Sequence, residues 1–134
     1  MVTKEDIEGF LNRLDGAGAS HSEVQPGLWV VKPGGALDFD VVVRLEPPVV
    51  VMSVKVMTVP SDGKREATLN RRLLELNASD LVHGAYGIED DAIVMAEALE
   101  LSHLDYEEFQ AAFESITVAL ASHLREIGTY REAR

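Results

Sequence analysis

The chain has 134 residues, enough for one domain with its own core, and its 23 acidic against 12 basic residues give a formal net charge of −11. This charge argues against nucleic acid as a partner, because affinity for a phosphate backbone comes from basic side chains. The absence of cysteine excludes disulfides, thiolate metal sites and a cysteine nucleophile.

The amino terminus is charged and lacks the apolar run of a signal peptide. No apolar stretch approaches the roughly 20 residues that cross a bilayer. We therefore expect a single domain over residues 1–134 that is cytoplasmic and does not enter a membrane.

The first element is predicted to be a short amphipathic helix. Thr3 can cap it, and Asp6, three residues on, gives a variant of the capping box. Its apolar face is formed by Ile7, Phe10, Leu11 and Leu14, and the glycines at 16 and 18 end it. We expect it to lie across a sheet.

Three segments of strand character follow. The first is 28–31, bounded by Pro26-Gly27 and Pro33-Gly34-Gly35. In the second, 36–46, apolar and polar residues alternate, with Asp38 and Asp40 on the polar side. The third, 49–59, carries an uncharged face formed by Val50, Met52, Val54 and Val56. These strands predict an antiparallel meander with one buried face.

The second half of the chain predicts a helix, a hairpin and a last helix. Leu69, Leu73 and Leu76 form the stripe of an amphipathic helix, which Leu74 widens, and the helix ends near residues 77–80. A strand over 81–88 turns on Glu89-Asp90-Asp91 and returns over 92–99. Asp105 and Glu108 can cap the last helix. The stripe of this helix fits a coiled-coil seam but is better explained by packing on a sheet. The stripe is formed by Phe109, Phe113, Ile116, Leu120, His123 and Ile127. Gly128 ends it before a charged tail, Tyr130 to Arg134.

The resulting order, α-β-β-β-α-β-β-α, predicts an α+β fold with helices packed on an antiparallel sheet. Three loose patterns accompany this order: Gly27-Leu28-Trp29, the helix with Leu69, Asn70, Leu73, Leu74 and Asn77, and Gly84-x-x-Gly87 before an acidic turn. In these features the chain resembles the YbjN-domain family, whose architecture is shared by type III secretion chaperones of the CesT and Tir chaperone class.

The resemblance implies a non-enzymatic homodimer that binds another protein, either a secreted effector or a regulatory partner. It places the partner or dimer surface on the second helix and the following strand, at Leu73, Leu76, Val82 and Tyr86. Trp29, the single tryptophan, is either a core residue or a partner anchor. Arg71 and Arg72 are expected to keep the second helix soluble, with contact to an acidic partner as the alternative.

No residue pattern predicts a catalytic, cofactor-binding or metal site. The histidines, predicted on a loop, a strand, a turn and a helix, form no HxH or HxxxH pair: His21, His83, His103 and His123. Gly84 and Gly87 lack the other residues of a phosphate loop, so we interpret them as points where another element packs closely.

The alternative hypothesis is a small-ligand sensor or a modest hydrolase. Its pocket would lie between the sheet and the last helix and use Asp38, Asp40 or His83.

Overall fold

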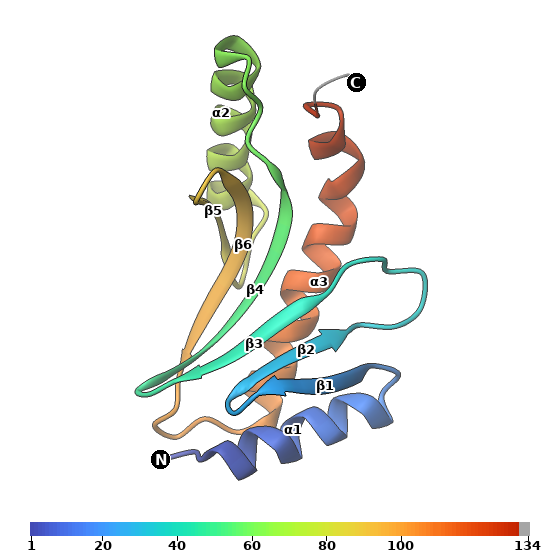
Figure 1. Cartoon of the computed structure of the whole chain (residues 1–134), viewed down its shortest axis with the longest axis vertical. Coiled ribbons are helices and arrows are strands. Elements are labelled where there is room, and N and C mark those ends of the chain that lie inside the picture. The colour runs from blue at the N-terminus through green and yellow to red at the C-terminus, as the bar shows by residue number, and fades with distance from the viewer. Residues whose placement is uncertain (132–134) are drawn as a thin grey trace.

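The computed structural model describes residues 1–131, so the end of the predicted charged tail, Tyr130 to Arg134, lies outside the described residues. The described residues form three helices and six strands, in the order α1 (Lys4–Gly16), β1 (Ser20–Gln25), β2 (Leu28–Lys32), β3 (Val41–Glu46), β4 (Val49–Thr58), α2 (Gly63–Ser79), β5 (Ala85–Glu89), β6 (Ala92–Glu100) and α3 (Tyr106–Gly128). Figure 1 shows α1 at one end of the molecule and α2 beside the end of α3 at the other.

All strands join one antiparallel sheet in the order β1-β2-β3-β4-β6-β5. The predicted α+β architecture and element order are confirmed, with one further strand, β1, ahead of the predicted three. β1 was missed because its sequence, SHSEVQ, lacks apolar alternation and it lies at the edge of the sheet, where five of its six residues are exposed. The second predicted strand is shorter than expected, since β3 begins only at Val41 and Asp38 and Asp40 lie in the preceding loop.

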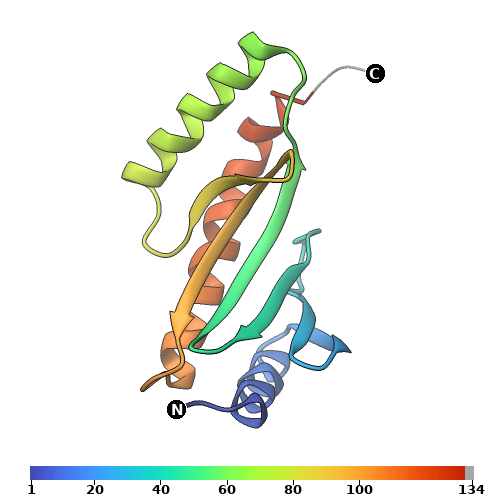
Figure 2. The same ribbon diagram turned by 60° about the vertical axis from the view of Figure 1, so that its left-hand side comes forward.

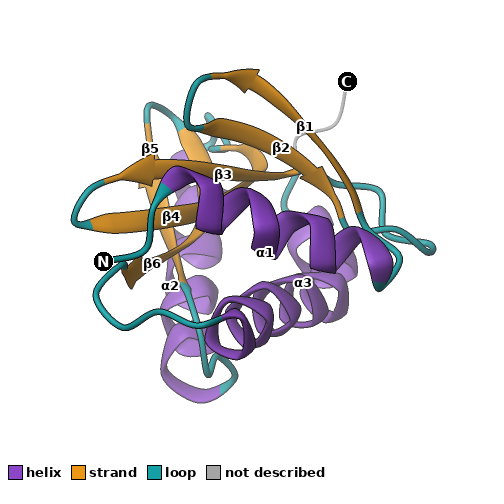
Figure 3. Cartoon of the chain, turned by 90° about the horizontal axis from the view of Figure 1, so that it is seen from below, coloured by secondary structure: helices purple, strands orange, loops and turns teal. Residues whose placement is uncertain are grey.

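The three helices cover one face of the sheet, which we call the inner face (Figure 3). The inner face carries the large buried side chains of the strands, among them Trp29, Met52, Ile93 and Met95. α3 lies against them with its whole predicted stripe buried, so packing on the sheet is confirmed over a coiled-coil seam. α1 packs on α3, where the Phe10 and Phe109 ring centroids are 5.4 Å apart.

Local sequence signals determine several element ends. Thr3 and Asp6 form the predicted capping box of α1, and Asp105 accepts a hydrogen bond from Glu108 N–H at the start of α3. Asp90 and Asp91 form the β5–β6 turn with φ values of 48° and 62°, as a two-residue type I′ hairpin requires. No helix among the described residues has the length and apolar character needed to cross a bilayer.

Candidate partner-binding site

The sheet face opposite the helices, which we call the outer face, is covered by no other element of the described chain (Figure 3). It is lined by small apolar side chains that are half-buried or exposed: Val30, Val42, Val51, Val94, Ala96 and Ala98. Val42, Ser53 and Ala96 lie in one row across β3, β4 and β6. The outer face therefore carries an apolar strip across its middle, with the charged residues Arg44, Glu46 and Lys55 on the same side of β3 and β4. An exposed apolar strip with a polar rim is a type of surface that commonly contacts another protein.

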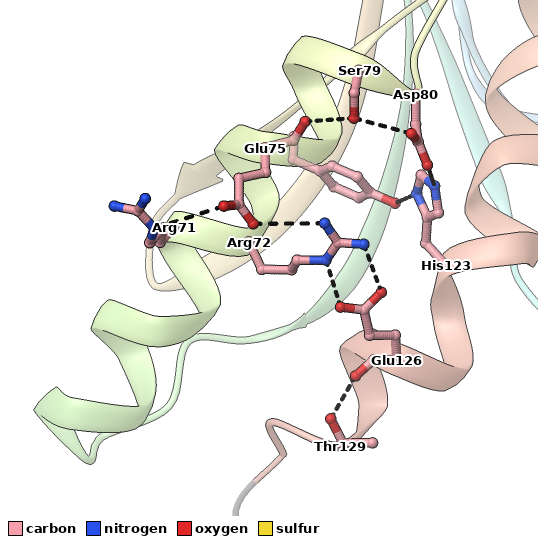
Figure 4. Close-up of polar contacts among 9 residues, drawn as sticks. Arg71, Arg72, Glu75, Ser79, Asp80, His123, Glu126 and Thr129 are labelled. Carbon is pink, nitrogen blue, oxygen red and sulfur yellow. Dashed lines mark hydrogen bonds and ion pairs between the residues drawn. The ribbon is translucent and has the colours of Figure 1, made fainter.

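A buried polar network joins α2, β5 and α3 at one end of this sheet (Figure 4). The Tyr86 hydroxyl lies 2.7 Å from His123 Nδ1, and His123 Nε2 lies 3.2 Å from Asp80 Oδ2. Burial raises the pKa of the Tyr86 phenol, so this hydroxyl stays protonated and can donate to Nδ1. Because the Asp80 carboxylate can only accept, His123 donates to it from Nε2.

A second polar contact joins α2 to α3, about one turn along α3 from His123. Arg72 Nε and Nη2 donate to the two carboxylate oxygens of Glu126 over 2.6 and 3.2 Å. The Arg72 guanidinium lowers the pKa of the Glu126 carboxyl. Arg72 therefore forms an ion pair within the chain, whereas Arg71 is exposed beside Glu75 (Figure 4).

The free edge of β5 is closed by a side chain of α2. Asn77 Oδ1 accepts from Tyr86 N–H at 2.7 Å, and Asn77 Nδ2 donates to the Tyr86 carbonyl over 3.2 Å. The side-chain amide replaces a neighbouring strand at this residue, so both outward backbone groups of Tyr86 are satisfied. An added strand would have to displace Asn77.

The structure separates the five residues predicted for the partner or dimer surface. Trp29, Leu73, Leu76 and Tyr86 are buried within the single chain, so their side chains belong to the core and the polar network. The buried stripe of α2 packs against α3 and β5. Little of this stripe is therefore left to contact another molecule. Val82, in the α2–β5 loop, is 87% exposed.

Two further exposed apolar residues lie on α2 and β5, the two elements on which the partner surface was predicted. Leu74 on α2 is 67% exposed and Ile88 on β5 is 55% exposed. α2 and β5 run in opposite directions (Figure 2), so Leu74 and Ile88 both lie on the same side of the Asn77–Tyr86 contact. Sequence could have signalled Leu74, because it lies beside the Leu69, Leu73 and Leu76 stripe and not within it.

The two glycines of the predicted close-packing motif differ. Gly84 has φ +80°, and a Cβ there would lie 2.9 Å from Ile116 Cγ2 of α3, so the predicted close approach of the last helix is confirmed. Gly84 lies just before β5 and not within a strand. At Gly87 no described residue lies within 4 Å of the Cβ position, so a close approach by α3 is excluded there and one by a second subunit stays a prediction.

A cavity of about 370 Å³ lies between β3, β4 and α3, where the alternative hypothesis placed a pocket. Asp38 and Asp40 line it, and Lys32 Nζ lies 2.9 Å from Asp40 Oδ1. His83 is not part of this cavity. It lies in the α2–β5 loop instead of a strand, with Nδ1 3.7 Å from Glu97 Oε2.

The remaining histidines are dispersed. His21 lies in β1 and not in a loop, His103 lies in the turn before α3, and His123 lies in the buried network. Within the part of the chain that the structure describes, no group of three or more histidine and acidic side chains could hold a metal ion.

Comparison with known proteins gives a family. The family model CesT_Tir_1 matches residues 1–133, nearly the whole chain. The chain belongs to this family. No curated protein sequence matches the chain.

Solved structures support the fold of this CesT_Tir_1 protein. A chain of the heterodimeric ExoU–SpcU complex from the type III secretion system of Pseudomonas aeruginosa is similar with a TM-score of 0.62 and 15% identity, covering 89% of this chain and 95% of that one. YbjN from E. coli is similar with a TM-score of 0.62 and 19% identity, covering 94% and 96%. A chain of the HopA1–SchA chaperone–effector complex has a TM-score of 0.54 and 12% identity, covering 95% and 94%. The CesT_Tir_1 protein therefore has the fold of type III secretion chaperones and YbjN.

Proposed function

We propose that this CesT_Tir_1 protein is a non-enzymatic, cytoplasmic binding module that acts as a homodimer and holds another protein, as a chaperone or a regulator. The observation that carries the proposal is the apolar surface left uncovered in the single chain: the outer face of the sheet together with Leu74, Val82 and Ile88. Membership of the family and likeness to chains from chaperone–effector complexes support a protein as the partner.

The second copy is proposed to pack on the α2–β5 side of the molecule, over Leu74, Val82 and Ile88. These side chains are apolar and exposed, and the Asn77–Tyr86 contact and the polar network join the elements that carry Leu74 and Ile88 to each other and to α3. Their burial would gain free energy by removing apolar area from water without ordering a loose segment. The buried Tyr86 side chain would pack beneath this surface.

Light scattering of the purified chain at micromolar concentration tests the dimer. Leu74→Glu is expected to give a monomer, because it would bury a charge in the interface. Val118→Glu is the matched control, since Val118 on α3 is 64% exposed against 67% for Leu74. A monomeric wild-type chain, or a Leu74→Glu variant that stays dimeric, would contradict the proposed interface.

Affinity capture from an extract of the source organism, followed by mass spectrometry, tests the partner. One stoichiometric protein bound to the wild-type chain is expected.

The alternative function, a small-ligand sensor, is favoured by the cavity that Asp38 and Asp40 line. A thermal-shift screen of metabolites and metal ions tests it, because a ligand that binds the folded state raises the melting temperature. A flat screen would reject the sensor.

A further inference from the structure

The cavity of about 370 Å³ beside β4 and α3 has a largely apolar wall, and we call it the β4–α3 cavity. Its apolar lining comes from the β2–β3 loop, β3, β4 and α3, through Phe39, Val42, Val54, Val56, Leu120 and Leu124. Three of these residues, Val54, Val56 and Leu120, are buried, so part of the wall belongs to the core of the domain. The volume lies at the lower end of the range for small-molecule pockets, roughly 300–1,000 Å³. The β4–α3 cavity therefore has the size and the wall of a pocket for a small apolar group.

A β-bulge in β4 shapes this wall. Lys55 pairs with Val94 of β6 and Met57 pairs with Ile93, so Val56 is an extra residue without a partner in β6. A bulge bends its strand and redirects a side chain, and bulges are common beside functional sites. Val56 is buried and lines the cavity, so the bulge contributes directly to the apolar wall.

The rim of the β4–α3 cavity carries more unpaired positive charge than unpaired negative charge. Among the described residues, Lys55, Arg131 and Asp38 line the cavity and form no ion pair. Asp40 also lines the cavity, but its carboxylate is paired with Lys32 Nζ at 2.9 Å. The unpaired groups are thus two cations and one anion, in a chain of net charge −11. An anionic ligand would therefore meet a local attraction that is unusual on this acidic protein.

A backbone donor of β4 faces the same space. Glu46 and Val49 close a two-residue turn and form a hydrogen-bonded pair, so alternate residues of β4 direct their N–H groups toward β3. Lys55 belongs to this series, and the register places it opposite Asp40, which lies before β3 begins. The N–H of Lys55 is therefore directed toward the cavity, where a ligand carboxylate could accept a hydrogen bond from it.

We infer that the β4–α3 cavity binds an aliphatic carboxylic acid of about the length of octanoate. The carboxylate lies beside Lys55 and Arg131, and the aliphatic chain lies between Val56 of β4 and Leu124 of α3. The apolar wall supplies affinity by removing the chain from water. The positive rim favours a carboxylate over an amine of the same length. This inference gives a ligand class to the alternative function and requires neither the proposed dimer nor the protein partner.

The test uses octanoate, below its micelle-forming concentration, as a probe of the full chain. Amide shifts in NMR titrations give both the Kd and the location of the bound probe. 1-Octanol keeps the chain without the charge, octylamine reverses the charge, and acetate keeps the charge without the chain. Octanoate is expected to bind most tightly and to shift the amides of Val54, Val56 and Leu124. 1-Octanol should bind about two- to fivefold more weakly, because it lacks the attraction of the exposed cations, and octylamine and acetate more weakly still.

Charge variants test the rim. Lys55→Glu is expected to raise the Kd for octanoate by about threefold or more, since it replaces an attraction by a repulsion. Lys64→Glu is the matched control, because it reverses an exposed charge at the start of α2, outside the cavity, and should leave the Kd unchanged. Asp38→Asn should lower the Kd for octanoate, whereas it would raise the Kd for a cationic ligand.

A larger side chain in the wall tests the cavity itself. Leu124 is half-buried, and Leu124→Trp is expected to fill the cavity and abolish binding of octanoate. Val118→Trp, on the exposed side of the same helix, is the control and should keep the wild-type Kd. Leu124→Ala, which removes apolar wall without blocking the cavity, should raise the Kd severalfold.

Three results would overturn the inference. Octanoate could fail to bind, or octylamine could bind as tightly as octanoate. Amide shifts centred on Leu74 and Ile88 would place the probe on the exposed apolar surface and not in the cavity. An unchanged Kd in both Lys55→Glu and Leu124→Trp would separate binding from the rim and the wall.

Other occupants of the cavity give different results. Loss of the dimer in Leu124→Trp would assign the cavity to a second copy, and loss of a captured protein would assign it to the partner. A dimer that captures a partner but does not bind octanoate would lose only this inference. Octanoate binding in the cavity of a monomer that captures no protein would keep the inference and remove the proposed function.

Discussion

Among the strand edges of the described residues that lack a neighbouring strand, those of β5 and of the end of β4 differ in how they are covered. At β5, the Asn77 side chain satisfies both outward backbone groups of Tyr86. At β4, the segment after Ser53 faces a cavity, and β3 provides no residue to pair with Lys55. The comparison teaches that an edge strand can be closed by one side chain, whereas an edge beside a cavity keeps backbone groups without a strand partner.

The closed region should be the more sensitive to substitution, and Tyr86 the most sensitive residue within it. Tyr86→Ala is expected to lower the free energy of unfolding by about 3–5 kcal/mol, because it removes a buried aromatic ring. Tyr86→Phe keeps the ring and removes only the hydrogen bond to His123, for a loss of about 1–2 kcal/mol. Urea unfolding measures both, and equal losses for the two variants would show that the network and not the ring holds β5.

Removing the Asn77 side chain that closes the β5 edge is expected to have the next largest effect on stability. Asn77→Ala leaves Tyr86 N–H and C=O without their partners and should cost about 1–2 kcal/mol. It should also speed hydrogen exchange at the Tyr86 amide and, because a bare edge can pair with another chain, increase self-association at high concentration. Asn12→Ala, on the exposed side of α1, is the control. An unchanged Tyr86 exchange rate would mean that Asn77 does not close the edge.

Hydrogen exchange in the unmodified chain compares the two edges directly. The Lys55 amide, which has no ladder partner, should exchange at least about tenfold faster than the Tyr86 amide, although β4 is central and β5 is an edge strand. Amide exchange followed by NMR gives both rates in one sample. Equal protection would indicate that the cavity beside Lys55 is occupied or closed in solution.

The smallest effect concerns the ion pair that holds α2 against α3. Arg72 lowers the pKa of the Glu126 carboxyl below its ordinary value of 4.5, so the pair stabilises the fold above that pH. This contribution is lost as the pH falls from 4.5 through the lower folded pKa, because the unfolded chain takes up the proton first.

Urea unfolding from neutral to acid pH measures this dependence. Glu126→Gln should be less stable than wild type at neutral pH, and the difference should shrink below pH 4.5. Glu114→Gln, on the exposed side of the same helix, is the control. A Glu126→Gln difference that stays constant with pH would exclude the ion pair as its source.

Much of the fold could be predicted because its signals are local. The stripe from Phe109 to Ile127, the Thr3 and Asp105 caps and the Asp90-Asp91 turn each lie within a few residues of what they determine. The partner surface could be predicted only in part, because the stripe places Leu74 beside its line but does not tell which side of α2 another element covers. Leu73 and Leu74 are adjacent and equally apolar, yet one is buried and the other is exposed, because only the placement of α3 and β5 decides which face of α2 is covered.

The sequence by itself determined the composition limits, the helices, most strands and the α+β order, since hydrophobic periodicity and capping act over short distances. The tertiary structure alone decided how Asp80, Tyr86 and His123 meet, and how the ends of β3 and β4 lie against α3 around the cavity. Each of these features joins residues far apart in the chain, and pairing between distant segments depends on the packing of the whole sheet and not on any one stretch.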